Sequence, residues 1–186
     1  MAHYCIRCGT QLVIRTIEGR ELEACPNDDF VLWRDPKVSA AVVVEAGGGI
    51  ILGRRAIEPG YGLWCLPGGF VNDDEDPAEA AVRECREEIR VDVVITGLIG
   101  VYHVPKQDAS SMIGIAYRAR VADDGASPSA GAEMLEVRVF PLDALPPLAF
   151  PSHRRVLNDL FAGATAARPE TQPSTGRAPR RSPRRR

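Results

Sequence analysis

Short apolar or alternating segments recur along the chain, and this pattern predicts β-strands. The segments are VSAAVVVE (38–45), GIILGRR (49–55), GLWCLP (62–67), VVITGLIGVYHV (93–104), SMIGIAYRARV (111–121) and LEVRVFPL (135–142). Closer to the N-terminus, QLVIRTIEGRELEA (11–24) reads as two alternating segments that turn at Glu18-Gly19. This stretch predicts a miniature hairpin.

Between Asp76 and Ile89 the apolar period changes to that of a helix. Asp76 suits the N-cap, Pro77 suits the first helical position, and Glu79 completes a capping-box spacing. One apolar stripe is expected to face the core: Ala78, Ala81, Val82, Cys85 and Ile89. A second helix is predicted near 152–161. Mixed strands with one central and one late helix predict an α/β or α+β sandwich.

Composition divides the 186 residues into three regions. Residues 1–34 form the hairpin module, residues 36–162 the main domain, and residues 163–186 an Arg- and Pro-rich tail that is predicted to be disordered. The net charge of −2 hides an asymmetry, because residues 164–186 carry +6 and residues 1–163 carry −8. The tail is expected either to bind nucleic acid or another polyanion, or to be a solvated segment without a partner.

The sequence argues against a membrane-spanning protein and against a secreted protein. A membrane span would need roughly 18 uninterrupted apolar residues, and the sequence has no such stretch. The N-terminus lacks the apolar core of a secretory signal, so we expect a soluble, cytoplasmic protein. In a reducing compartment the five cysteines are free or metal-bound rather than paired in disulfides.

Carboxylates are concentrated in the predicted helix. Glu84 and Glu88, four residues apart, lie at the border of the buried stripe, and Glu87 lies farther out. Like charges at this spacing destabilise a helix by roughly 0.2–0.5 kcal/mol, and no cation is expected on the same side of the helix. Either this is a solvated acidic face, or a divalent cation such as Mg²⁺ offsets the repulsion.

The stretch from Gly68 to Val91 resembles the signature of the Nudix hydrolases. The matching positions are Gly69, Glu75, Arg83-Glu84, Glu87-Glu88 and Val91, and the flanks extend the resemblance over about residues 38–161. Three departures stand inside the motif. Arg90 replaces the usual glycine, Asp73-Asp74 replaces Pro-Gly, and Cys85 occupies an aliphatic position.

The resemblance implies a Nudix-type α/β/α sandwich with a small N-terminal zinc-ribbon-like hairpin module. It further implies that Glu84 and Glu88, helped by Glu87 and the carbonyl of Gly69, hold Mg²⁺ or Mn²⁺. Glu75 and Arg83 would form an ion pair that orients the loop and helix behind Gly68 and Gly69. The proton would be taken by a glutamate before a late strand, for which Glu133 and, second, Glu136 are the candidates.

The N-terminal module carries Cys5-x-x-Cys8 and Cys25, with Asp28 where a fourth cysteine would complete a zinc ribbon. Asp28 would bind a structural Zn²⁺ through oxygen, His3 or Asp29 would substitute for it, or the site is degraded. The layout resembles the zinc-ribbon Nudix group that acts on FAD, ADP-ribose and NADH. The proline- and Gln-rich signature of NADH pyrophosphatases is missing, so NADH is a less favoured substrate than FAD or ADP-ribose.

These observations predict a Mg²⁺-dependent pyrophosphohydrolase that cleaves ADP-ribose or FAD to AMP and the other phosphorylated half. The alternatives are hydrolysis of NADH or nucleoside triphosphates, and a non-catalytic nucleotide sensor or nucleic-acid-binding protein of the same fold. The retention of Glu84, Glu87 and Glu88 favours catalysis over sensing. A small-molecule nucleotide is the expected partner, and a homodimer is left open.

Overall fold

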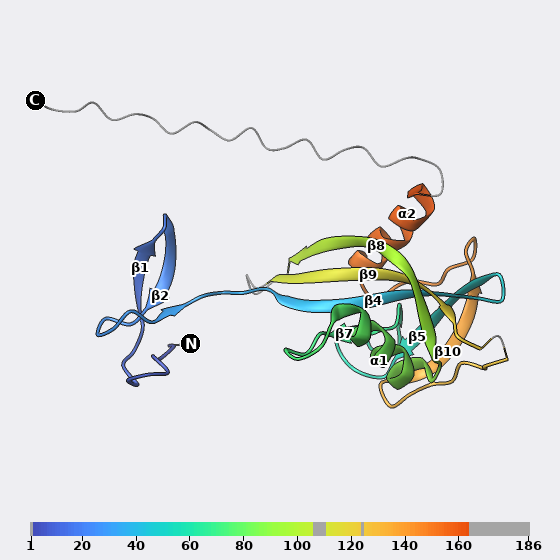
Figure 1. The fold of residues 1–186 in the computed structure, drawn as a ribbon, viewed down its shortest axis with the longest axis horizontal. Helices are drawn as coiled ribbons and strands as arrows, with labels where there is room; N and C mark the ends of the chain where they lie inside the picture. The colour runs from blue at the N-terminus through green and yellow to red at the C-terminus, as the bar shows by residue number, and fades with distance from the viewer. Residues whose placement is uncertain (1, 106–110, 124, 164–186) are drawn as a thin grey trace, which may run out of the picture.

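The computed structural model describes residues 2–105, 111–123 and 125–163, in two sheets and two helices (Figure 1). The small sheet contains β1 (Val13–Ile17), β2 (Arg20–Ala24) and β3 (Val31–Leu32). The large sheet contains β4 (Lys37–Ala46), β5 (Gly49–Arg55), β6 (Trp64–Cys65), β7 (Gly68–Phe70), β8 (Val93–Pro105), β9 (Ser111–Val121) and β10 (Met134–Pro141). The helices are α1 (Pro77–Ile89) and α2 (Pro151–Gly163).

The large sheet is mixed, with β4 at its centre. Its main path runs β10-β5-β4-β9-β8, while β6 pairs with β5 and β7 pairs with β4. β4 and β9 are parallel, in register from Lys37 opposite Met112 to Glu45 opposite Arg120, and the other pairs are antiparallel. β4 therefore holds the two halves of the sheet together.

Each face of the large sheet is covered by one helix. Because successive strand residues point to opposite faces, Val42 and Val44 pack in the core cluster with α1, whereas Val43 packs in the cluster with Val156 and Leu157 of α2. The sheet thus lies between α1 and α2 (Figure 1). The predicted α/β/α sandwich is confirmed.

Helix α1 begins as the sequence predicts. The Asp76 side chain accepts a hydrogen bond from the Ala78 N–H at 2.8 Å, and Glu79 completes the capping box. Arg90 ends the helix in the left-handed conformation, with φ 58° and ψ 32°, so this side chain adopts a geometry that usually favours glycine. Ala80, rather than Ala78, is fully buried in the apolar stripe.

Some expected boundaries are wrong. The strand predicted over 62–67 shortens to β6. Gly68 and Gly69 are the first residues of a further strand, β7, opposite Ala41 and Ala40. A Cβ at Gly68 would lie 2.2 Å from the carbonyl oxygen of Ala40, so this strand pairing requires glycine. α2 continues to Gly163, the first residue of the predicted tail, and residues 164–186 lie outside the described residues.

The N-terminal hairpin is confirmed. β1 and β2 pair antiparallel around Glu18 and Gly19, which both have positive φ. The hairpin lies to one side of the sandwich, and the chain between β3 and β4 links the two (Figure 1). Neither helix of the described part of the chain is long and apolar enough to cross a membrane.

Candidate active site

A cavity of about 1600 Å³ opens beside the N-terminal half of β4. Its walls come from β4, β7, α1, β8 and β9, from the chain just before β10, and from the first residues of α2. Six of the predicted site residues line it from α1 and β7: Gly68, Gly69, Arg83, Glu84, Glu87 and Glu88. The sheet and α1 thus bring the acidic helix and the glycine pair to one hollow.

Glu88 is the deeply buried carboxylate of this cavity, with 4% of its surface exposed. Its Oε2 accepts a hydrogen bond from the Gly68 N–H at 2.8 Å, which ties α1 to β7. Burial raises the pKa of Glu88 to about 8, and repulsion from Glu84 and Glu133 contributes in the same direction. A cation near this carboxylate would stabilise its charged form.

Glu84 lies one turn earlier and packs against Gly69. A Cβ at Gly69 would lie 2.3 Å from Oε1 of Glu84, so the absence of a side chain makes room for the carboxylate. Burial raises the pKa of Glu84, while the guanidinium of Arg83, which donates from Nη1 at 2.8 Å, acts against this shift. The expectation that no nearby cation reaches the Glu84/Glu88 pair is therefore wrong for Glu84, because the long Arg83 side chain folds back to it.

Arg83 connects the helix to the loop before it. Its Nε and Nη2 donate to the two carboxylate oxygens of Glu75 at 2.7 and 3.0 Å, so the expected ion pair is present. Nη2 also donates to the carbonyl of Phe70 at 3.0 Å, and Nη1 donates to Glu87 at 3.1 Å. The Arg83 side chain holds the pKa of Glu75 down to about 2. This network fixes the loop between β7 and α1.

The two glutamates proposed as proton acceptors differ in their surroundings. Glu133 lines the cavity, and its charge is close enough to raise the pKa of both Glu84 and Glu88. Its carboxylate has no hydrogen bond or ion pair with the residues that the structure describes. Glu136, on β10, pairs with Arg138 and lies 4.0 Å from Nη1 of Arg54, away from the cavity lining.

Two cavity residues were not predicted from the sequence. Arg55 is only 9% exposed, donates from Nε to the Pro59 carbonyl at 2.7 Å, and lies 5.0 Å from the ring centre of Phe150. Nδ1 of His153, on α2, accepts from the Leu66 N–H at 3.1 Å. Burial and then the charge of Arg55 lower the pKa of His153 to about 4. Alternation along 49–55 puts Arg55 on the same face of the strand as the buried Ile51. This alternation is the sequence signal that could have predicted the burial of Arg55.

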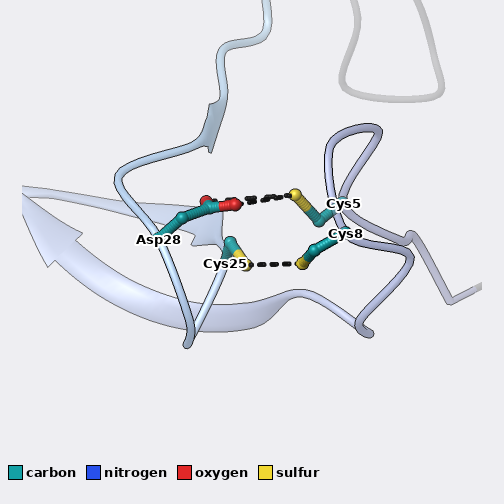
Figure 2. Close-up of side chains that lie close together, drawn as sticks. All are labelled: Cys5, Cys8, Cys25 and Asp28. Carbon is teal, nitrogen blue, oxygen red and sulfur yellow. Dashed lines mark hydrogen bonds between the residues drawn. The ribbon is translucent and has the colours of Figure 1, made fainter.

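A second cluster of candidate ligands lies in the N-terminal module. Figure 2 shows the side chains of Cys5, Cys8, Cys25 and Asp28 pointing toward one another. One ligand atom from each lies within 4.8 Å of the others. The predicted cluster is therefore assembled in space by the two loops that flank the hairpin.

Comparisons with known proteins match most of the chain. The NUDIX domain model matches residues 34–160. The ADP-ribose pyrophosphatase of Methanocaldococcus jannaschii is 35% identical over 131 residues, which cover 70% of this chain and 76% of that protein. The NAD-capped RNA hydrolase NudC of Pseudomonas aeruginosa is 30% identical over 160 residues, covering 85% of this chain and 54% of that protein.

A solved structure agrees with these matches. The crystal structure of a NUDIX hydrolase from Nitrosomonas europaea superposes with a TM-score of 0.74 at 30% sequence identity. The superposition covers 86% of this chain and 93% of that one. The similarity therefore extends over most of the sheet and helices that build the cavity.

Proposed function

Since the chain belongs to the NUDIX family, we propose that it hydrolyses the diphosphate of a nucleoside diphosphate linked to another moiety. ADP-ribose or FAD is the favoured substrate, with AMP and the other phosphorylated half as products. The observation that carries this proposal is the convergence of Glu84, Glu88 and Glu133 on one large cavity. The charge of Glu133 helps to raise the pKa of both Glu84 and Glu88, and such a concentration of negative charge favours binding of a cation.

The residues present fit a hard divalent cation. Mg²⁺ and Mn²⁺ prefer carboxylate and carbonyl oxygens together with water and phosphate oxygens, which is the donor chemistry found here. Glu84 and Glu88, with Glu87 and the Gly69 carbonyl, are the proposed ligands. When bound, such an ion neutralises charge on the diphosphate and lowers the pKa of a coordinated water.

The side chains of the chain itself have separate proposed roles. Glu133 accepts the proton of the attacking water, because it lines the cavity, whereas Glu136 pairs with Arg138 and lies outside the cavity lining. Arg83 is a positioning residue, since its contacts to Glu75, Glu84 and Phe70 set the loop and the carboxylate in place. Gly69 leaves space for that carboxylate.

The choice of substrate rests on the relatives and on the size of the cavity. The Methanocaldococcus relative carries the name ADP-ribose pyrophosphatase, and a cavity of about 1600 Å³ is large enough for a dinucleotide. A second candidate is the NAD(H) diphosphate, free or as an RNA cap, because the NudC relative matches 85% of this chain. Nucleoside triphosphates and a sensor without turnover are the remaining alternatives.

The test is a substrate panel with a matched variant pair on the same helix. ADP-ribose, FAD, NADH, an NAD-capped RNA and nucleoside triphosphates are each incubated with Mg²⁺ or Mn²⁺, and the products are separated. We expect AMP from ADP-ribose or FAD, and a roughly 10³-fold lower kcat in Glu88→Gln, because several kcal/mol of charge stabilisation depend on the metal.

The matched control is Glu79→Gln, an exposed position of α1 where glutamine keeps the capping box. It should retain wild-type turnover within about twofold, since it lies away from the cavity lining. Binding of a nucleotide by the wild type with no turnover of any substrate would contradict the hydrolase proposal and favour a sensor.

A further inference from the structure

We propose that Cys5, Cys8, Cys25 and Asp28 form a tetrahedral Zn²⁺ site of three thiolates and one carboxylate, on which the folding of residues 2–33 depends. The four side chains come from two loops, one before β1 and one between β2 and β3. This site lies outside residues 34–160, which the NUDIX model matches, and it is independent of the proposed hydrolysis.

The distances fit a tetrahedral metal. With Zn–S bonds of about 2.3 Å, tetrahedral ligand atoms lie about 3.8 Å apart. Sγ of Cys8 is 3.5 Å from Sγ of Cys25, and Sγ of Cys5 is 3.5 Å from Oδ2 of Asp28 (Figure 2). The two pairs face each other across a common centre, so one ion would touch all four groups.

Backbone N–H groups support the proposed ligands. The Arg7 N–H donates to Sγ of Cys5 and the Asn27 N–H donates to Sγ of Cys25, both at 3.4 Å. The Phe30 N–H donates to Oδ1 of Asp28 at 2.8 Å, which leaves Oδ2 turned toward the thiols. Such donors orient ligands and stabilise their negative charge, as in the outer shell of metal sites.

The structure distinguishes between the candidates for the fourth ligand. Nδ1 of His3 contacts the carboxylate of Glu23 at 2.9 Å, and Asp29 forms an ion pair with Arg7. Neither belongs to the group of ligand atoms that lie within 4.8 Å of one another. Asp28 is therefore the oxygen ligand, and three soft thiolates beside it favour Zn²⁺ over Mg²⁺.

The module has little else to stabilise it. Its buried core cluster is Cys5, Leu12 and Cys25, with Phe30 and Leu32 packed against it, so two of the three residues of this cluster are proposed ligands. Chains shorter than about 40 residues usually need a metal or disulfides to fold. Zinc binding to such small sites supplies most of the free energy of folding.

The experiment measures zinc per chain and zinc affinity, by competition with a chromogenic chelator, on the full chain. We expect one zinc per chain in wild type and in Glu88→Gln, which removes a ligand of the carboxylate site. Asp28→Ala should weaken zinc affinity at least about 100-fold, and its matched control Asp29→Ala should stay within about threefold. Asp28→Cys should restore or tighten binding.

A second readout covers the case in which Asp28→Ala fails to fold. Co²⁺ in the wild type should give the intense visible absorption of tetrahedral thiolate coordination, and Asp28→Cys should shift the thiolate-to-metal band. Equal zinc affinity of wild type and Asp28→Ala would contradict the proposal that Asp28 is a zinc ligand. Wild-type protein without bound zinc, or zinc lost in Glu88→Gln, would overturn the site.

Discussion

The sandwich and the N-terminal module are stabilised in different ways. Two hydrophobic clusters, one under each helix, cover both faces of the large sheet. The core cluster of the module contains only three buried residues, Cys5, Leu12 and Cys25. The sandwich can therefore hold a buried carboxylate at Glu88 against its desolvation cost, whereas the module depends on groups that a metal would link. The two candidate metal sites thus differ in their proposed roles, since one would serve catalysis and the other would serve folding.

The largest effect is expected when one cysteine is replaced by serine in each of the two regions. In Cys25→Ser, we expect the amides of residues 2–33 to lose their hydrogen-exchange protection, since a zinc site worth on the order of 10 kcal/mol is broken. Cys65→Ser, at a buried thiol of the sandwich, should cost only about 1–3 kcal/mol and leave the module protected. Equal local effects of the two variants would contradict the contrast.

A smaller effect concerns the stability of the metal-free sandwich between pH 5 and pH 8. Because the folded protein keeps Glu88 protonated up to a pKa of about 8 while the unfolded chain releases this proton near pH 4.5, folding binds protons in this range. The free energy of unfolding should fall as pH rises, by on the order of 4 kcal/mol at most.

The control for this pH dependence is Glu88→Gln, which cannot ionise. Urea unfolding of both proteins at pH 5, 6, 7 and 8 should show the steeper decline in the wild type. Parallel pH profiles would show that Glu88 is not held protonated in the folded state. Below pH 4.5 the opposite sign is expected from Glu75, whose pKa of about 2 means that its ion pair with Arg83 is lost on acidification.

Next in size is the effect of removing the proposed proton acceptor. Glu133→Gln should lower kcat roughly 10²-fold with little change in KM, because general base catalysis contributes at least this much. The matched variant Glu136→Gln removes a carboxylate that pairs with Arg138, and should stay within about twofold. Steady-state kinetics on the preferred substrate checks both. The reverse ranking would move the role to Glu136.

The smallest expected effect is at the glycine pair. Gly69→Ala places a Cβ against the Glu84 carboxylate, the movable end of a side chain, so we expect a roughly 10-fold loss of kcat with nearly unchanged stability. Gly68→Ala instead meets the backbone oxygen of Ala40 and should destabilise the sheet. Melting temperatures and rates for both variants separate the two roles. A similar loss of stability in both would contradict this assignment.

Local features of the fold were predictable from the sequence because they depend on neighbours in the chain. The Asp76 cap follows from its spacing, the Glu75–Arg83 pair is implied by the resemblance to the Nudix signature, and both are present. The depth of Glu88 was not predictable, because it depends on β7 pairing with β4 and covering the helix.

The choice between Glu133 and Glu136 likewise needed three-dimensional information. A register shift between Met134 and Glu136 interrupts the alternation of β10. Counting residues along the strand therefore does not show which face of the sheet the Glu136 side chain lies on. Arg55 and His153 line the same cavity although they lie almost a hundred residues apart in the chain, and such proximity has no local signature in the sequence.

The most direct test of the central claim is Mn²⁺ binding to the sandwich, followed by electron paramagnetic resonance in the zinc-loaded full chain. The account predicts saturable binding in the wild type and in Glu79→Gln, and at least about 10-fold weaker binding in Glu88→Gln, because a proposed ligand loses its charge. Equal Mn²⁺ affinity in all three proteins would show that the buried carboxylate of α1 does not hold the cation.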